Sequence, residues 1–169
     1  MKKILFVCSL LLTVNFYGQK KVEISLQQDA RLLILGDDKG NDPLTVNLMS
    51  KLEVPIHNFK KSHISTYLSV EYADLAGKNY KRYALGIGYV LDSVYKKIGA
   101  GAYVDFGKIY RKAEGFNSYS LSGELSFKLN NCLRFICTQQ LTHRKDLKIL
   151  YNSKKEFIIS GFVGIKYSI

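Results

Sequence analysis

The feature that most constrains the fold is an alternation of apolar and polar side chains with a period of two residues, which runs from Val22 to Ile169. This period is typical of β-strands whose two faces meet different environments. Eight segments carry it: Val22–Leu35, Leu44–Val54, Ile64–Tyr72, Tyr80–Leu91, Ile98–Lys108, Tyr119–Leu129, Cys132–Thr142 and Phe157–Ile169. Most match the roughly 9–11 residues that a tilted membrane strand needs, whereas soluble strands average about 5–6 residues. We therefore predict an all-β chain of eight antiparallel strands.

Residues 1–18 differ from the rest of the chain and are typical of an export signal. Lys2 and Lys3 precede an apolar region of eleven residues, Ile4–Val14, and Gly18 offers a cleavage point. An apolar run of this length is too short for a transmembrane helix, which needs about 20 residues, but it fits the hydrophobic region of a cleaved signal peptide. The sequence predicts a signal peptide over 1–18 and one barrel domain over 19–169.

The connections between the predicted strands alternate between two sets. Gly36–Pro43, Ala73–Asn79, Tyr110–Ser118 and His143–Glu156 form one set, and Pro55–His63, Asp92–Lys97 and Asn130–Asn131 form the other. Small membrane barrels place longer loops outside the cell and shorter turns in the periplasm. The first set contains the longest loop, so we expect it to face outward.

The polar face of the strands is rich in Gly and Ser and carries charges of both signs. Gly weakens a strand face that is in water, but small residues make room for large ones inside an eight-stranded barrel. We therefore place the polar face in the lumen, where paired charges avoid isolated buried charge. The predicted lumen charge network is Arg31, Arg82, Asp105, Glu124 and Arg134.

The apolar face is then predicted to face lipid, with aromatic residues near strand ends as two girdles. These aromatic residues are Tyr72, Tyr80, Tyr83, Phe106, Tyr119, Phe127, Phe157 and Tyr167. Two glutamines, Gln28 and Gln139, also fall on this face, and we expect a bulge or a local register slip there.

With its signal peptide, eight alternating strands and a last strand that ends Val163, Ile165, Tyr167, Ile169, the chain resembles the small eight-stranded outer-membrane β-barrel proteins of diderm bacteria. The resemblance covers 22–169 and is one of pattern. It implies an up-and-down transmembrane barrel in the cell outer membrane, whose last strand is read by the barrel-assembly machinery. The family usually ends in an aromatic residue, whereas this chain ends in Ile169.

Metal and cofactor chemistry is not indicated, so we expect neither. His57, His63 and His143 lack the spacing of a zinc site, and the oxygen-rich segment 37–42 lacks the distal Glu of a calcium loop. Cys132 and Cys137 are five residues apart on one predicted strand, so their side chains point to opposite faces and cannot pair.

Basic charge is the remaining signal, because the chain has a formal charge of +11. Part of it lies in the loop His143–Glu156, as Arg144, Lys145, Lys148, Lys154 and Lys155. Facing outward, these residues would meet outer-membrane lipid, lipopolysaccharide or surface glycans; a merely solubilising loop is the equal alternative. Nucleic acid is not an expected partner of an exported chain.

The sequence thus predicts a monomeric, non-enzymatic outer-membrane barrel with a structural or surface-interaction role, and no open pore, since eight strands leave no wide channel. An exported soluble, lipocalin-like barrel that binds a small hydrophobic ligand in an apolar interior is the alternative. A lipid-modifying enzyme is the third reading, with His143 and Ser153 as the available outward pair.

Overall fold

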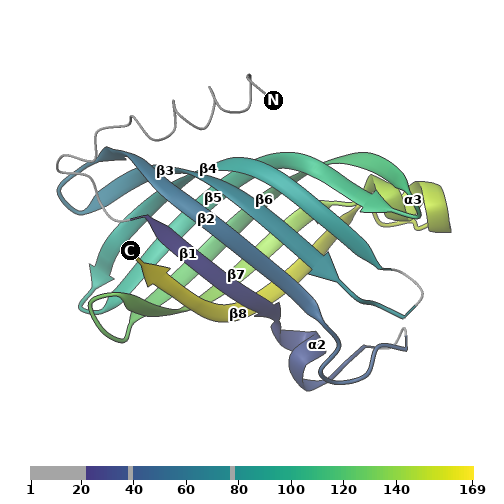
Figure 1. The fold of residues 1–169 in the computed structure, drawn as a ribbon, viewed down its shortest axis with the longest axis horizontal. Coiled ribbons are helices and arrows are strands. Elements are labelled where there is room, and N and C mark those ends of the chain that lie inside the picture. Colours follow the sequence, from purple (N-terminus) through teal and green to yellow (C-terminus); the bar gives the residue numbers. More distant parts are fainter. Residues whose placement is uncertain (1–21, 38–39, 77–78) are drawn as a thin grey trace, which may run out of the picture.

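The prediction of an eight-stranded antiparallel up-and-down barrel is confirmed in the computed structural model, which describes residues 22–37, 40–76 and 79–169 (Figure 1). The strands are β1 (Glu23–Asp29), β2 (Asn47–Asn58), β3 (Ser62–Ala73), β4 (Tyr80–Tyr95), β5 (Ile98–Arg111), β6 (Glu114–Lys128), β7 (Leu133–His143) and β8 (Phe157–Ser168). Each strand pairs with the next, and β1 pairs with β8, so the sheet closes on itself. The predicted signal peptide, 1–18, lies outside the described residues. No helix among the described residues is long and apolar enough to cross a membrane.

The two ends of the barrel differ in their connections. We call the end that carries 30–46, 74–79 and 144–156 the loop end, and the end that carries 59–61, 96–97 and 129–132 the turn end. Two short helices, α2 (Ala30–Ile34) and α3 (Lys145–Tyr151), lie at the loop end (Figure 1). The predicted loop Tyr110–Ser118 is wrong, because β5 and β6 continue to a tight turn at Lys112 and Ala113. Both turn residues have positive φ, 49° and 65°, as the favoured two-residue hairpin turns require.

The first predicted strand, Val22–Leu35, is wrong in its second half. The chain leaves the sheet after Asp29 and forms α2 instead. The Asp29 carboxylate accepts hydrogen bonds from the main-chain nitrogens of Arg31 and Leu32, at 3.0 and 3.1 Å. A capping Asp of this kind satisfies free N–H groups at a helix start, and it overrides the alternation that continues beyond it.

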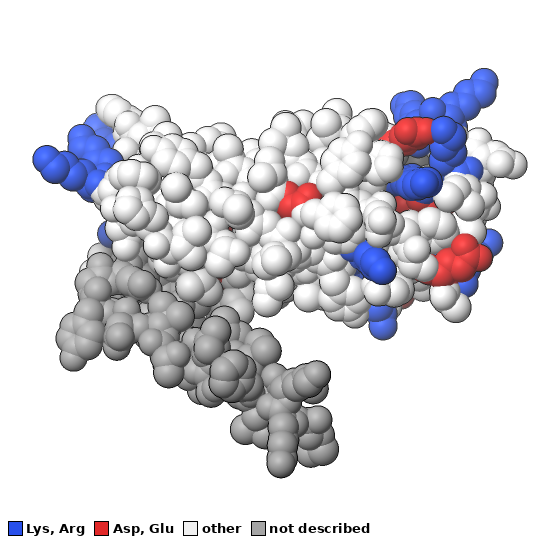
Figure 2. Space-filling model, turned by 90° about the horizontal axis from the view of Figure 1, so that it is seen from above, with Lys and Arg blue, Asp and Glu red and all other residues white. Residues whose placement is uncertain are grey.

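The apolar face of every strand points out of the barrel and the polar face points in. Leu68, Leu85, Ile87, Leu121 and Leu125 are each more than half exposed in the middle of strands. On the face shown in Figure 2, the charged side chains at the surface gather mainly at the two ends, and the band between them shows little charge. A lipocalin-like protein needs the reverse arrangement, with apolar side chains lining the interior.

Aromatic rings lie on the outward face near both ends of the barrel. Tyr72, Tyr83, Tyr110, Tyr119 and Phe157 do so toward the loop end, and Phe59, Tyr89, Phe127, Phe135 and Tyr167 toward the turn end. The prediction that Tyr80 belongs to an outward girdle is wrong, because its ring is buried inside the barrel. It has the parity of the polar face, three residues from the outward Tyr83.

Two large rings fill the middle of the interior, and glycines make room for them. The Tyr67 and Tyr103 rings meet edge to face, with centroids 5.5 Å apart. A Cβ on Gly86 would lie 2.5 Å from the Tyr67 ring, and one on Gly88 would lie 2.3 Å from the Tyr103 ring. The predicted pairing of small with large residues in the lumen is therefore confirmed.

The predicted irregularity at Gln28 and Gln139 is wrong. The register of β1 with β2 and of β7 with β6 and β8 is continuous through both residues. The Gln28 amide donates to the Thr45 carbonyl at 2.8 Å and accepts from the Asn47 nitrogen at 3.2 Å, so its polar atoms are paired without a bulge. The register shifts are instead between Pro55 and His57 in β2 and between Leu91 and Tyr95 in β4.

Candidate functional site

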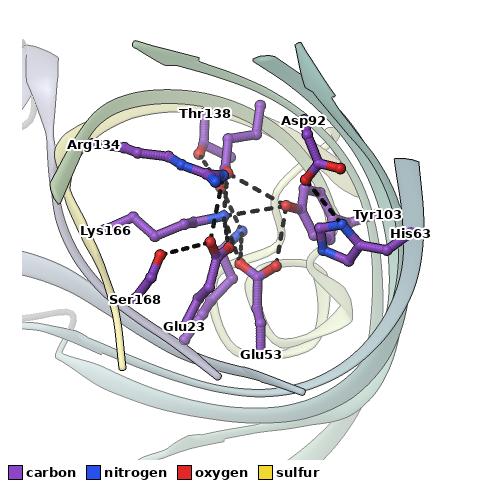
Figure 3. A network of polar contacts seen from close by, with 11 residues as sticks. Glu23, Glu53, His63, Asp92, Tyr103, Arg134, Thr138, Lys166 and Ser168 are labelled. Carbon is purple, nitrogen blue, oxygen red and sulfur yellow. Dashed lines mark hydrogen bonds and ion pairs between the residues drawn. The ribbon is translucent and has the colours of Figure 1, made fainter. Parts of the chain in front are cut away.

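The interior holds a network of ion pairs centred on Lys166 of β8 (Figure 3). The Lys166 Nζ lies 2.8 Å from the Glu53 carboxylate and 3.8 Å from that of Glu23, and it also donates to Glu124. Lys51 donates to the other oxygen of Glu124 at 2.9 Å. All these side chains are less than a tenth exposed, so the network ties β1, β2, β6 and β8 together across the lumen.

The charges of this network balance. Arg134 at the turn end lies 3.3 Å from Glu23, which brings the network to three cations (Lys51, Arg134, Lys166) and three carboxylates (Glu23, Glu53, Glu124). The Tyr103 hydroxyl oxygen lies 3.2 Å from a Glu53 carboxylate oxygen and 3.3 Å from one of Glu124, so its single proton can be donated to either. A balanced and hydrogen-bonded set of this kind avoids the large free-energy cost of a single unpaired buried charge.

A second interior network is built on Arg82 of β4 and Asp105 of β5. The Arg82 guanidinium donates to one oxygen of Asp105 and to the Ser118 hydroxyl at 3.1 Å. The other Asp105 oxygen accepts from the hydroxyls of Tyr67 at 2.9 Å and Ser120 at 2.7 Å. The guanidinium and the carboxylate are both almost fully buried, so this pair lies inside the lumen, between the centre and the loop end.

The structure brings most of the predicted lumen residues into these networks. Arg82 and Asp105 pair with each other, Glu124 binds two lysines, and Arg134 approaches Glu23. Arg31 is a correction, because it lies on α2 with an exposed side chain and not in the lumen.

Further interior residues of the polar face complete the networks beyond the five predicted for the lumen charge network. They are Glu23, Lys51, Glu53, Tyr67, Tyr103 and Lys166. All of them have the alternation parity of the polar face, and that parity was the available signal. Alternation places the two tyrosines on the polar face as well, and the structure confirms that both rings lie inside the barrel.

The five basic residues predicted to face outward separate into two groups. Lys145, Lys148, Lys154 and Lys155 are exposed at the loop end, and Lys148 donates a hydrogen bond to Glu156. That hydrogen bond holds the pKa of Glu156 below its ordinary value. Arg144 is a correction, since it is buried and therefore not available to an external surface.

Arg144 instead belongs to a cluster inside the barrel mouth at the loop end. Its guanidinium donates to both oxygens of Asp146, at 3.0 and 3.1 Å, and lies 4.1 Å from the centre of the Tyr80 ring. Burial opposes the charged form of Arg144, but the Tyr80 hydroxyl and Asp146 outweigh it and raise the Arg144 pKa above its ordinary value. The Nε atom of Arg111 lies 3.3 Å from the same Asp146 carboxylate.

The outward pair His143 and Ser153 is engaged elsewhere. The His143 ring stacks on Tyr119, with centroids 4.6 Å apart, and its Nε2 lies 3.9 Å from the Glu156 carboxylate. The Ser153 hydroxyl donates to the carbonyl of Lys155 at 3.1 Å. Within the described residues, no group of three His, Cys, Asp or Glu side chains is placed to hold a metal ion, and Cys132 and Cys137 are not joined by a disulfide.

Comparison with known proteins gives matches of fold alone. No family model matches the sequence, and no curated protein matches it. The structure of the Yersinia pestis outer membrane protein Ail in a phospholipid bilayer nanodisc has a TM-score of 0.56 and 12% identity, over 89% of this chain and 100% of Ail. The crystal structure of Ail, the attachment invasion locus protein of Yersinia pestis, has a TM-score of 0.48 and 12% identity, over 90% of this chain and 99% of Ail. The chain therefore has the fold of the small eight-stranded bacterial outer-membrane barrels, as its sequence pattern predicts.

Proposed function

We propose that this protein is an integral outer-membrane barrel that works as a scaffold for the surface at its loop end. The observation that carries the proposal is the distribution of side chains: apolar residues cover the outside of the barrel, and the polar interior is filled by paired charges. In water, an exposed apolar belt around a whole barrel would be a strong aggregation hazard. In a bilayer it is the required surface.

Fractionation of cells and gel electrophoresis with and without boiling test the location. We expect the mature chain in the outer-membrane fraction, with a mobility that changes on heating because a closed barrel resists detergent. Replacing the outward, mid-strand Ile87 by Arg should weaken insertion by roughly 2–4 kcal/mol, since Arg is costly at the bilayer midplane. A soluble wild-type chain, or normal insertion of Ile87→Arg into vesicles, would refute the location.

The role of the barrel is non-enzymatic in this proposal, and its filled interior is not an open pore. Large buried side chains occupy the lumen at successive levels, among them Lys166, Tyr103, Tyr67 and Arg82. An eight-stranded barrel has an interior just wide enough for such filling. The barrel is proposed to act as a monomer, and its last strand, with outward Ile165 and Tyr167, to be read by the barrel-assembly machinery.

The exposed lysines at the loop end are proposed to bind anionic lipopolysaccharide. Lys145, Lys154 and Lys155 are exposed there. Positive charges gathered at a membrane surface attract anionic headgroups. A variant with all three changed to Gln should bind purified lipopolysaccharide more weakly, and the difference should shrink at high salt because exposed charges are screened.

A matched control lies at the opposite end of the barrel. Lys60, Lys61 and Lys97 are exposed at the turn end, so changing them to Gln alters the total charge equally. This control variant should bind like the wild type. If the loop-end and turn-end variants lose affinity for lipopolysaccharide equally, the total charge of the protein, and not the loop, determines the binding.

A further inference from the structure

We propose that the mouth of the barrel at the loop end binds a single oxyanion, a phosphate or carboxylate group, on the guanidinium of Arg111. This site lies below the exposed lysines and does not depend on lipopolysaccharide binding. Arg111 is the last residue of β5, and the tight turn at Lys112 and Ala113 fixes its main chain.

The guanidinium of Arg111 is buried and has unused hydrogen-bond donors. Its side chain is 1% exposed, and within the described part of the chain none of its three nitrogens has a hydrogen-bond acceptor. Asp146 is 3.3 Å from Nε but outside hydrogen-bond geometry. Buried guanidinium groups in proteins are normally paired and hydrogen-bonded, so a donor set of this kind indicates a missing acceptor.

Directly beside the Arg111 guanidinium, cations outnumber carboxylates. Asp146 is already held by Arg144 through two hydrogen bonds, so two guanidinium groups share one carboxylate. The other carboxylates of the mouth already accept hydrogen bonds. Glu71 accepts from the Tyr80 hydroxyl, Asp37 accepts from the Asn41 amide at 2.9 Å, and Asp74 accepts from the Asn79 amide at 2.7 Å. Asp29 is committed to capping α2 and to the Asn47 amide at 3.3 Å. A bound anion would therefore balance Arg111.

Two spaces meet at Arg111. One is a cavity of about 100 Å³ beneath α2, which Arg111 lines together with Tyr80, Arg144 and Ser160. The other is an open recess of about 550 Å³, whose polar lining is Asp74, Asn79, Arg111, Lys112 and Tyr151. Since a water molecule takes about 30 Å³, the smaller space admits one oxyanion group but not a sugar ring. The recess and the cavity share Leu75, Ala76 and Arg111 in their linings, so the guanidinium lies between the outside and the smaller space.

The chemistry of the site selects planar or tetrahedral oxyanions. A guanidinium presents parallel N–H groups that match two oxygens of a carboxylate or phosphate. The rings of Tyr80 and Tyr151 flank it, with centroids 5.0 and 5.5 Å from the guanidinium carbon, so the fork is held in place before a ligand arrives. Lys112, at the rim of the recess, adds positive potential on the way in.

The test uses the full mature chain in a phosphate-free detergent. Inorganic phosphate is titrated while the NMR signal of the Arg111 Nε–H group is followed. We expect a saturable shift of that signal, and at least a tenfold weaker binding of phosphate by Arg111→Gln as measured by calorimetry. Lys112→Gln removes the same charge one residue away and should change the affinity much less.

A second arm separates the two sources of the anion. In nanodiscs that contain anionic phospholipid, a headgroup in the site would shift the Nε–H signal before phosphate is added, whereas a free ion would not. Both results support the site. The proposal is overturned if phosphate gives no saturable shift, or if folded Arg111→Gln, checked by circular dichroism and heat-dependent mobility, binds phosphate as the wild type does. The detergent arm is independent of where the barrel is located in the cell.

Discussion

Removing the central interior cation should strongly destabilise the barrel. Lys166 faces three carboxylates, those of Glu23, Glu53 and Glu124, and it is the cation nearest to Glu53, since Lys51 is 3.9 Å from that residue. The change Lys166→Met keeps most of the volume but leaves two cations against three carboxylates in a buried network. Breaking a buried pair by removing one partner costs about 3–5 kcal/mol, so we expect the free energy of unfolding to fall by that amount.

Urea titration of the folded chain in lipid vesicles, followed by far-ultraviolet circular dichroism, measures the loss. The double variant Lys166→Met with Glu53→Gln restores the charge balance, so it should recover most of the stability. Lys97→Met makes the same chemical change on an exposed turn residue and should be nearly neutral. The reasoning is refuted if Lys166→Met lowers the free energy of unfolding by about 0.5 kcal/mol or less, which is the effect of an ordinary surface substitution. It is also refuted if the double variant is less stable than Lys166→Met alone.

Three further outcomes follow from the structure. Gly164→Ala should lower the free energy of unfolding by about 1–3 kcal/mol through overpacking, because the added Cβ would lie 2.0 Å from a main-chain oxygen of β1. Gly161→Ala on the same strand is the control, because its Cβ would meet nothing within 4 Å. Equal urea midpoints for the two variants would contradict this prediction. Asp29→Ala should cost about 0.5–2 kcal/mol through loss of the α2 cap, seen as faster amide hydrogen exchange in α2, and unchanged exchange would argue against the cap. Lys148 lowers the pKa of Glu156, so their contact stabilises the loop fully above the ordinary carboxyl pKa of 4.5 and is lost as the pH falls through the lower pKa of the folded state. Hydrogen exchange of the α3 amides, corrected for the intrinsic exchange rate, should therefore become faster only at that acidic pH. Glu156→Gln should remove this pH dependence.

The alternation of the sequence predicted the fold well because a strand with two different surroundings records them residue by residue. Tyr67 and Tyr103 show where parity is a better guide than residue type, since both follow the polar face into the lumen. The rule fails where a local hydrogen bond competes with the sheet. Asp29 ends β1 early although Leu32 and Ile34 keep the alternation, and this misplaced Arg31.

The cluster at the barrel mouth was beyond prediction for a different reason. Arg111, Arg144 and Tyr80 come from three separate parts of the chain, and each looks ordinary in its own segment. Arg144 was assigned to an exposed loop because nothing local shows that its side chain turns inward to Asp146. Only the closed barrel places these groups around one space.

Closure of the barrel joins the two ends of the described chain, and this has a consequence for how the protein folds. The Ser168 hydroxyl donates to Glu23 across 145 residues, and Lys166 reaches the same carboxylate. A nascent barrel therefore holds unmatched carboxylates until β8 arrives, and contacts so distant in sequence form slowly. A slip of β8 by two residues keeps the apolar face outward but moves Lys166 by about 6.6 Å along the barrel, away from its partners. Only the correct register of β8, the strand that closes the ring, therefore brings Lys166 to its three carboxylates.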